Sequence, residues 1–233
     1  MLFRQLYDQE TSTYTYLLAD EDSKEAVIID SVLEQVERDQ KLIKELQLNL
    51  KYILETHVHA DHITGATELK KSFPNAKTIV HSKGGVECAD IHSTDGMEIK
   101  FGKYYLKVLS TPGHTNGCVS YYTEGMVFTG DALLIRGCGR TDFQQGDPSK
   151  LYDSITQKIF TLPDNTLVYP GHDYKGFTCS SVWEEKKYNP RLANKTKDEF
   201  ILIMNNLNLP YPKKIQESVP ANLKCGNIKL SDA

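Results

Sequence analysis

The densest group of metal-ligand side chains in this chain comes directly after a predicted buried strand, in the segment Thr-His-Val-His-Ala-Asp-His that ends at His62. Side chains of an extended segment alternate between two faces, so His57 and His59 point the same way. Asp61 and His62, at the following turn, can reach round to a neighbouring position. Neutral imidazoles and a carboxylate together suit zinc, iron or manganese. The alternative is a polar loop without a metal, which is disfavoured because ionisable groups rarely cluster without a ligand.

Three later segments place a glycine beside a ligand-type residue at the end of a predicted strand. They read Pro-Gly-His, Thr-Gly-Asp and Pro-Gly-His, and their ligand-type residues are His114, Asp131 and His172. Glycine permits a tight turn and a close approach of the backbone. One such segment alone is more often an ordinary turn, but the four segments in this order predict a metal site. The two remaining histidines, His81 and His92, are interpreted as ordinary strand-end and loop residues.

Patterns typical of strands and of helices alternate in both halves of the chain. In the first half the expected strands span residues 13–18, 26–30, 52–54 and 77–80, and the expected helices span residues 33–46, capped by Ser31, and 63–73. In the second half the expected strands span residues 97–99, 104–110, 118–123, 126–129 and 167–169, and the expected helices span residues 149–162, 181–187 and 197–207. This mixture predicts two sheets packed face to face with helices outside.

The chain contains no repeat, low-complexity tract or obvious linker, so we expect a single domain over residues 1–233. Residues 178–233 are predicted to be a C-terminal helical and irregular extension packed on that domain. Beyond Leu209, prolines at positions 210, 212 and 220 predict an irregular tail. The Lys/Glu-rich stretch 183–197 is interpreted as a solvated helix face and loop.

Charge and hydropathy exclude several classes of function. The net charge of −4 provides no electrostatic footprint for nucleic acid or an anionic membrane. The longest apolar runs are far too short to span a bilayer. Residues 1–8 show neither a signal peptide nor a transit peptide, so we expect a cytoplasmic protein, or a mitochondrial matrix protein in a eukaryote.

Cysteine usage indicates a reducing compartment. The five cysteines are scattered, and none forms a Cys-x-x-Cys pair. Most are interpreted as small buried hydrophobic residues. Cys138, in a Gly-Cys-Gly turn, could line a site, but no activating base lies beside it in sequence, so it is not predicted to be a nucleophile.

Taken together, the ligand-type residues resemble the signature of the metallo-β-lactamase superfamily, in which His-x-His-x-Asp-His is followed by a distant His, Asp and His. The matching residues are His57, His59, Asp61, His62, His114, Asp131 and His172. The resemblance implies an α+β fold, an αββα sandwich with the metal site at one edge, between the two sheets. It leaves the reaction open, because one fold hosts many chemistries. Hydrolases of this superfamily use the seven ligands to hold two metals and to make a nucleophilic hydroxide.

A longer run is similar to the persulfide dioxygenase family. It spans residues 128–146 and reads FTGDALLIRGCGRTDFQQG. Further similarity lies in four short segments, residues 172–174, 189–192, 206–210 and 219–222. The resemblance therefore extends over nearly the whole chain, from the first strand to Cys225.

This second resemblance implies a reaction and a metal. The reaction is that of glutathione persulfide with O2 and water to give glutathione and sulfite, in hydrogen sulfide detoxification. The metal is one Fe(II) per chain, held by His57, His114 and Asp131 in the facial triad of non-haem iron oxygenases. The remaining residues of the signature then orient these ligands and tune the metal, or are alternative metal ligands: His59, Asp61, His62 and His172.

Glutathione carries carboxylates, which a bidentate arginine recognises well. By the same resemblance Arg140 lies near the glutathione site, with Tyr174 beside it. Arg191 is a further candidate, and a structural ion pair that holds the C-terminal segment is its equally weighted alternative. A rhodanese-type sulfurtransferase is a candidate upstream partner, and the family is compatible with a homodimer.

Two other functions remain open. A hydroxyacylglutathione hydrolase of the glyoxalase II type shares the seven ligands and would hold two metals. It is disfavoured by the run after Asp131 and because only 61 residues follow His172, which is little for the helical substrate domain of such hydrolases. A metal-binding scaffold or sensor without catalysis is disfavoured because the ligand set is complete.

Overall fold

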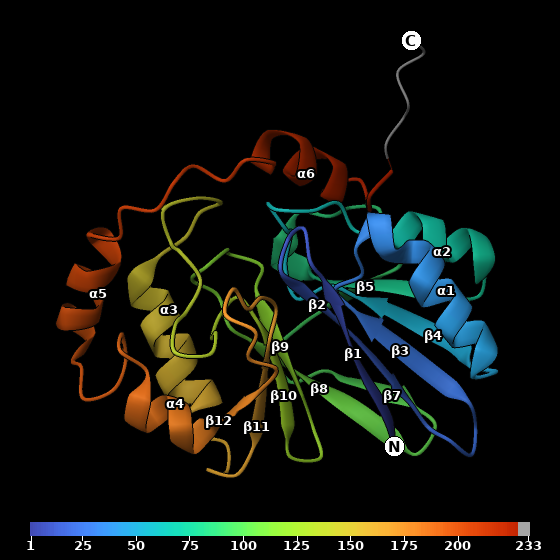
Figure 1. Cartoon of the computed structure of the whole chain (residues 1–233), viewed down its shortest axis with the longest axis horizontal. Coiled ribbons are helices and arrows are strands. Elements are labelled where there is room, and N and C mark those ends of the chain that lie inside the picture. Colours follow the sequence, from blue (N-terminus) through green and yellow to red (C-terminus); the bar gives the residue numbers. More distant parts are fainter. Residues whose placement is uncertain (228–233) are drawn as a thin grey trace. The chain divides into compact units, whose positions relative to one another are not determined.

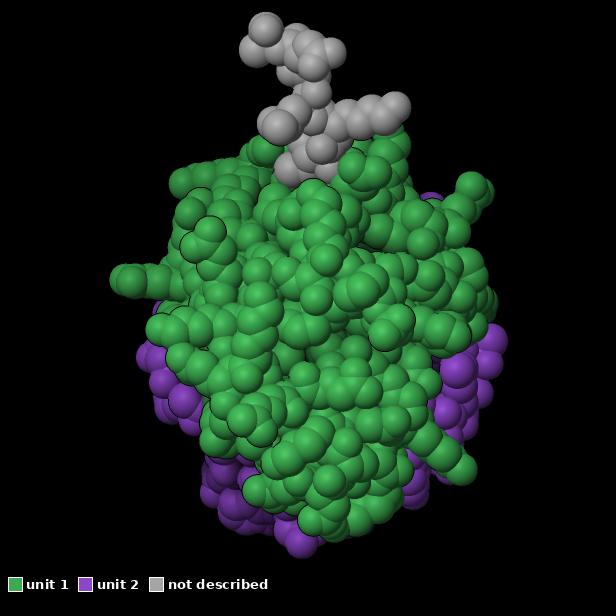
Figure 2. All heavy atoms as spheres, turned by 90° about the vertical axis from the view of Figure 1, so that its right-hand side faces the viewer, with its two compact units in different colours: residues 1–92, 100–104, 211–233 green, residues 93–99, 105–210 purple. Residues whose placement is uncertain are grey.

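Two six-stranded sheets organise the chain (Figure 1). The structure is a computed structural model and describes residues 1–227. The chain divides into two compact units, which Figure 2 colours separately. Unit 1 consists of residues 1–92, 100–104 and the segment from Tyr211 on, and unit 2 consists of residues 93–99 and 105–210. The chain thus begins in unit 1 and passes into unit 2, with a short return to unit 1 at residues 100–104, before it goes back to unit 1 at Tyr211.

The first sheet has the strand order β1-β2-β3-β4-β5-β6. Its strands are β1 (Leu2–Asp8), β2 (Thr13–Ala19), β3 (Glu25–Ile29), β4 (Asn49–Leu54), β5 (Lys77–His81) and β6 (Ile91–Ser93). Strands β1 to β3 pair antiparallel, whereas β3, β4 and β5 pair parallel. Parallel neighbours need a crossover connection, and helices α1 (Val36–Glu45) and α2 (Ala66–Ser72) provide it. The four strands expected in this half are confirmed.

Helices α1 and α2 begin later than the sequence predicted. A single 3-10 turn, Leu33–Gln35, precedes α1, and the expected cap Ser31 does not cap the helix. The carbonyl of Ser31 instead accepts a hydrogen bond from the amide of Gly65 (3.0 Å). Thr64 forms an isolated bridge with Val32, so α2 starts after it. Both helices pack their apolar side chains on the sheet in one core cluster that contains Ile28, Ile43, Ile53 and Leu69.

The second sheet has the order β12-β11-β10-β9-β8-β7. Its strands are β7 (Glu98–Phe101), β8 (Tyr104–Ser110), β9 (Val119–Thr123), β10 (Met126–Gly130), β11 (Leu167–Pro170) and β12 (Ser180–Ser181). Strands β8 to β10 pair antiparallel, and β10 pairs parallel with β11. The crossover is α3 (Pro148–Ser154), capped by Asp147 and continued by the π-helical segment Ile155–Ile159. The helix therefore ends earlier than the predicted residue 162.

The C-terminal segment contains three helices and divides between the units. Helices α4 (Val182–Tyr188) and α5 (Lys197–Asn205) belong to unit 2, whereas α6 (Ile215–Asn222) belongs to unit 1. The irregular tail predicted beyond Leu209 is thus wrong for residues 215–222, because α6 forms there even with Pro220 inside it. Its last part, residues 228–233, lies outside the described residues. The solvated stretch 183–197 is also only partly as predicted, since Glu185 is fully buried. Within the described residues, no helix has the length and apolar character needed to cross a membrane.

Candidate metal centre

The loop after β4 carries the first group of ligand-type residues, all in unit 1. Its histidines are buried: His57 is 3% exposed, His59 is 1% exposed and His62 is 0% exposed. Asp30, at the end of the neighbouring strand β3, fixes the start of the loop by accepting hydrogen bonds from the Thr56 amide (2.7 Å) and hydroxyl (2.8 Å). The Thr56 hydroxyl in turn lies 2.9 Å from His57 Nδ1. With Nδ1 engaged in this way, Nε2 is the nitrogen of His57 that is suited to a metal.

His59 lies among two carboxylates, Asp30 and Glu55, that are not part of the predicted ligand set. Its Nε2 is 3.1 Å from Asp30 Oδ1 and 3.4 Å from Glu55 Oε2. Burial lowers the pKa of His59, but the two carboxylates outweigh this effect and raise the pKa to about 10. The ligand atoms of these three residues are close enough together to hold an ion. Glu55 comes directly before the motif, and Asp30 follows the neighbouring strand β3. Their positions at strand ends are the feature of the sequence that could have identified them.

Asp61 and His62 form a pair at the end of the loop. His62 Nδ1 is 2.8 Å from Asp61 Oδ2, and the Thr13 hydroxyl donates to the same carboxylate oxygen (3.2 Å). The other ring nitrogen of His62, Nε2, is buried and makes no hydrogen bond to any described residue. A buried ring nitrogen without such a partner is costly unless a metal or water satisfies it. The pair of Asp61 and His62 therefore fits a metal site, and His62 remains a candidate ligand.

His114 and Asp131 form the second group, in unit 2. His114 Nδ1 lies 2.7 Å from the carbonyl oxygen of Arg140. Because a carbonyl only accepts, Nδ1 carries the proton, and Nε2 presents its lone pair. That nitrogen is 3.7 Å from Asp131 Oδ2. Two ligands that each lie about 2.1 Å from one ion can be at most about 4.2 Å apart, so this pair fits a single metal.

His172 orients the carboxylate of Asp131. Its Nδ1 is 2.6 Å from Asp131 Oδ1, which directs that oxygen toward the imidazole and leaves Oδ2 on the side of His114. The ring of His172 stacks on Tyr174, with a centroid separation of 6.1 Å and an interplanar angle of 2°. His172 is thus placed to orient this carboxylate, and its role beside a metal stays a prediction.

Two glycines explain why the chain can bring these residues together. A Cβ atom at Gly139 would lie 2.3 Å from the carbonyl oxygen of Asp131 and 2.8 Å from Cγ of His114. A Cβ atom at Gly171 would lie 2.9 Å from Asp131 Oδ1. Only glycine lets the backbone approach both ligands this closely.

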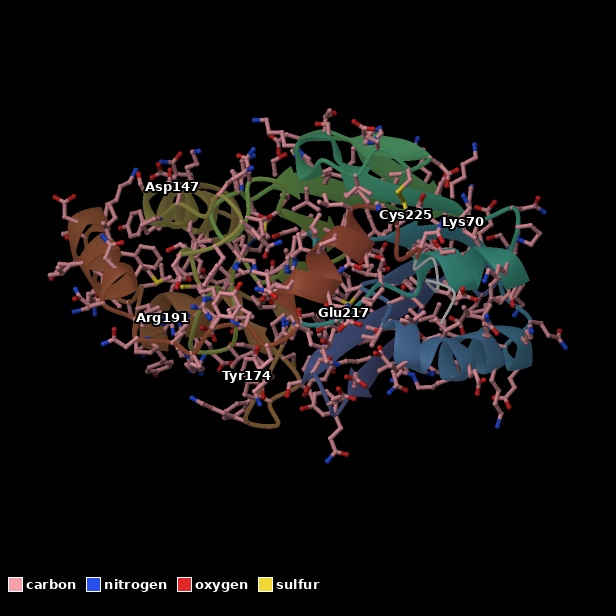
Figure 3. The ribbon with its side chains drawn as sticks, turned by 90° about the horizontal axis from the view of Figure 1, so that it is seen from above. Lys70, Asp147, Tyr174, Arg191, Glu217 and Cys225 are labelled. Carbon is pink, nitrogen blue, oxygen red and sulfur yellow. A yellow bond between two sulfur atoms is a disulfide. The ribbon has the colours of Figure 1, made fainter. Side chains whose placement is uncertain are left out.

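The predicted substrate residues lie in unit 2, and the arginines already have partners. Arg140 forms a bidentate pair with Asp142 (2.6 and 2.7 Å) and donates to the carbonyl of Pro210 (2.8 Å). Tyr174 is 71% exposed. Figure 3 marks Tyr174 and Arg191. Their role in substrate binding stays a prediction.

Arg191 holds the Gly-Cys-Gly turn. It donates a hydrogen bond to the carbonyl of Cys138 (2.7 Å). This contact differs from the structural ion pair that was the alternative prediction for Arg191. Burial raises the pKa of the Cys138 thiol, although Arg191 opposes this effect. The thiol therefore stays protonated at neutral pH, which agrees with the expectation that it is not a nucleophile.

Comparisons with known proteins place this site in a family. The sequence profile of the Metallo-beta-lactamase superfamily matches residues 9–172. The mitochondrial persulfide dioxygenase ETHE1 of Mus musculus is 52% identical over 228 residues, which make up 97% of this chain and 89% of that protein. The crystal structure of ETHE1 from Myxococcus xanthus is 55% identical and superposes with a TM-score of 0.95, covering 97% of this chain and all of that one (100%).

The chain belongs to the metallo-β-lactamase superfamily, and the fold class predicted from its sequence is confirmed. Within that superfamily it belongs to the persulfide dioxygenase family. Similarity to hydroxyacylglutathione hydrolases is more limited: that of Photobacterium profundum is 35% identical over 159 residues, covering 68% of this chain and 62% of that protein.

Proposed function

We propose that this chain is a glutathione persulfide dioxygenase in which His57, His114 and Asp131 hold one iron(II). The observation that carries the proposal is the similarity to persulfide dioxygenases over 97% of the chain. The overall reaction balances as glutathione persulfide, O2 and water giving glutathione, sulfite and two protons. The hydrolase alternative is not favoured, because its relatives are less similar and match a smaller part of the chain.

The donor set suits this metal. Iron(II) held by two imidazoles and one carboxylate would supply one-electron chemistry for the reaction of a persulfide with dioxygen. The residues of the chain itself provide orientation. The Arg140 carbonyl keeps the proton of His114 on Nδ1, and His172 holds the Asp131 carboxylate. Burial of the histidines limits access of water to the ligand atoms.

Arg140 is the proposed recognition group for a glutathione carboxylate. Its guanidinium presents two parallel N–H donors, which Asp142 occupies in the structure. We expect a substrate carboxylate to replace Asp142 on these donors, because both anions have the same bidentate geometry. The exchange is feasible because Asp142 is half exposed, with 53% of its side chain open to solvent.

The first experiment measures metal content and oxygen uptake of protein purified without oxygen. We expect about one iron per chain and oxygen consumption only when glutathione persulfide is added. Near two zinc ions per chain, with hydrolysis of S-lactoylglutathione and no oxygen uptake, would instead assign the hydrolase function.

The second experiment separates metal ligands from substrate residues. We expect His114→Ala to lose iron, because it removes a proposed ligand. Arg140→Ala keeps the backbone carbonyl that orients His114, so it should retain iron and raise KM for glutathione persulfide about tenfold or more. Arg191→Ala is the comparison variant, and an unchanged KM there would assign Arg191 to the Cys138 turn alone. Equal loss of iron in the Arg140 and His114 variants would contradict the proposed role of Arg140 in substrate binding.

We further propose that a rhodanese-type sulfurtransferase supplies the persulfide and that the chain forms a homodimer. The persulfide is reactive, so direct supply from an upstream enzyme is favoured. A coupled assay with such an enzyme, and light scattering of the purified chain, test these two points separately.

A further inference from the structure

One side chain from the end of the chain contacts the backbone of the metal loop at three points. Asn222, the last residue of α6, donates through Nδ2 to the carbonyls of His59 (2.9 Å) and His62 (2.8 Å). Its Oδ1 accepts a hydrogen bond from the amide of Thr64 (2.8 Å). The side chain is 5% exposed. Both ends of the amide are thus satisfied by the loop that carries four of the ligand-type residues.

The turn that follows Asn222 lies directly on this loop. A Cβ atom at Gly226 would come within 2.3 Å of the Thr64 carbonyl oxygen. The hydroxyl of Thr67, in α2, donates to the carbonyl of Cys225 (2.7 Å). The C-terminal end of α6 is therefore fitted to the segment between the metal loop and α2.

A disulfide bond attaches this turn covalently to another part of unit 1. Cys225, which is labelled in Figure 3, bonds to Cys88. Cys88 lies in the loop between β5 and β6. The two cysteines are 137 positions apart in sequence, so the bond closes a long loop and restricts the unfolded chain strongly. Cys88 is exposed, so a thiol in solution can reach it. The disulfide also corrects the interpretation of most cysteines as small buried hydrophobic residues, because Cys88 and Cys225 are bonded and neither is buried.

We propose that Asn222 is a positioning residue for the metal loop and that the Cys88–Cys225 disulfide makes this positioning sensitive to thiols. The effect on iron rests on the proposed function, whereas the effect on the loop does not. With the disulfide intact, the turn after α6 stays fixed and Asn222 holds the carbonyls of His59 and His62. When the disulfide is reduced, α6 loses its covalent attachment. The three hydrogen bonds between Asn222 and the loop then break more often.

Glutathione, the product of the proposed reaction, is a suitable reductant. Its thiolate attacks one sulfur of the disulfide, which forms a mixed disulfide and releases the other cysteine as a thiolate that takes a proton from water. A second glutathione thiolate attacks the mixed disulfide, releasing glutathione disulfide and the second cysteine. Two electrons pass from two glutathione molecules to the Cys88–Cys225 bond. Accumulating product would thus loosen the metal loop.

The first test uses amide hydrogen exchange of the metal-free full chain, so it does not depend on activity. We expect the Thr64 amide to exchange about five- to tenfold faster after glutathione treatment and in Cys88→Ser. Cys179→Ser removes an exposed free cysteine, is the matched control and should exchange like the parent. Unchanged exchange after loss of the disulfide would overturn the proposal, as would unpaired Cys88 and Cys225 in protein purified without thiols.

The second test measures release of iron(II) to a chelator in Cys88→Ser, Asn222→Ala and the double variant. We expect each single variant to release iron about five- to tenfold faster. The double variant should release it no faster than Asn222→Ala, because the disulfide acts through that side chain. If the two increases in release rate multiply in the double variant, the disulfide stabilises the loop independently of Asn222. That result would contradict the proposed coupling.

The two proposals fail in different ways. If the chain does not consume oxygen with persulfide but the Thr64 amide responds to the disulfide, the dioxygenase function is wrong and the positioning role stands. If oxygen is consumed and the amide does not respond, the positioning role is wrong and the dioxygenase function stands.

Discussion

At the scale of single residues, neighbours outside the metal motif orient its ligand-type side chains. The backbone of Arg140 sets the proton position of His114, and Asp30 fixes the start of the loop through Thr56. The sequence identified the ligand-type residues because each follows a strand, next to a glycine or in the histidine cluster. It could not identify the backbone partners, since any residue type has a carbonyl. Asn222 was missed for a related reason: its partners lie about 160 positions earlier in sequence.

Asp39 provides a pH-dependent prediction at the same scale. The carboxyl group is 1% exposed, and its Oδ2 has no hydrogen bond within the described residues. Burial raises its pKa to about 6, although Arg38 opposes this effect. The folded state therefore binds the proton more tightly than the unfolded state, whose carboxyl has a pKa of 3.8. Stability is lost as pH rises from about 4 to 6, by on the order of 2–3 kcal/mol.

We expect Asp39→Asn to stabilise the metal-free protein above pH 6 and to have little effect near pH 4. Urea unfolding of both proteins at several pH values measures the difference. Glu37→Gln, an exposed change on the same helix, is the control and should show no such pH dependence. A stability difference that is the same at pH 4 and pH 8 would contradict the raised pKa of Asp39.

At the scale of helices and strands, local signals predicted strands better than helix ends. Runs of β-branched and aromatic residues marked β2, β3 and β5 clearly, whereas α2 starts late because Thr64 pairs with Val32, a contact between distant residues. Helix α6 was missed because three nearby prolines indicate irregular structure. Its position depends on Asn222 and the disulfide, which are tertiary contacts.

The contact between the segment after β10 and α4 gives a prediction at this scale. Glu185 is fully buried and accepts hydrogen bonds from Ser180 (2.6 Å) and Asn189 (2.9 Å), besides its ion pair with Arg136. Arg136→Met would leave this carboxylate buried without its cation. We expect a loss of about 3–5 kcal/mol in the free energy of unfolding.

A matched control and a second variant sharpen this measurement. Lys186 forms an exposed ion pair with Asp164, so Lys186→Met should lose less than about 1 kcal/mol. Replacing both Arg136 and Glu185 by methionine should restore much of the stability lost in Arg136→Met. An equal loss in the free energy of unfolding for the Arg136 and Lys186 variants would show that the buried ion pair stabilises the fold no more than the exposed one.

At the scale of the whole chain, each unit has its own core and carries part of the proposed ligand set. Unit 1 contributes His57, and unit 2 contributes His114 and Asp131. The sequence predicted the two sheets correctly, because strand signals occur in both halves. It did not predict that the segment from Tyr211 on returns to unit 1, since that return depends on contacts with residues near the start of the chain.

Metal binding should stabilise the chain by mass action. Free iron(II) at a thousandfold excess over its dissociation constant is expected to add about 4 kcal/mol to the free energy of unfolding. Thermal unfolding without oxygen, with iron(II) or with a chelator, measures this effect. His57→Ala should unfold at the same temperature in both conditions, and an iron-dependent shift that persists in this variant would exclude His57 as a ligand.

The late position of Asn222 has a consequence for synthesis of the protein. A ribosome makes the chain from the N-terminus at about 5–20 residues per second, so all seven ligand-type residues emerge before α6 exists. Until then the loop from His57 to His62 lacks the side chain that holds its carbonyls. For the proposed iron site, tight loading is therefore expected only after α6 has been made. A chain terminated before α6 would carry every ligand-type residue and should retain iron poorly.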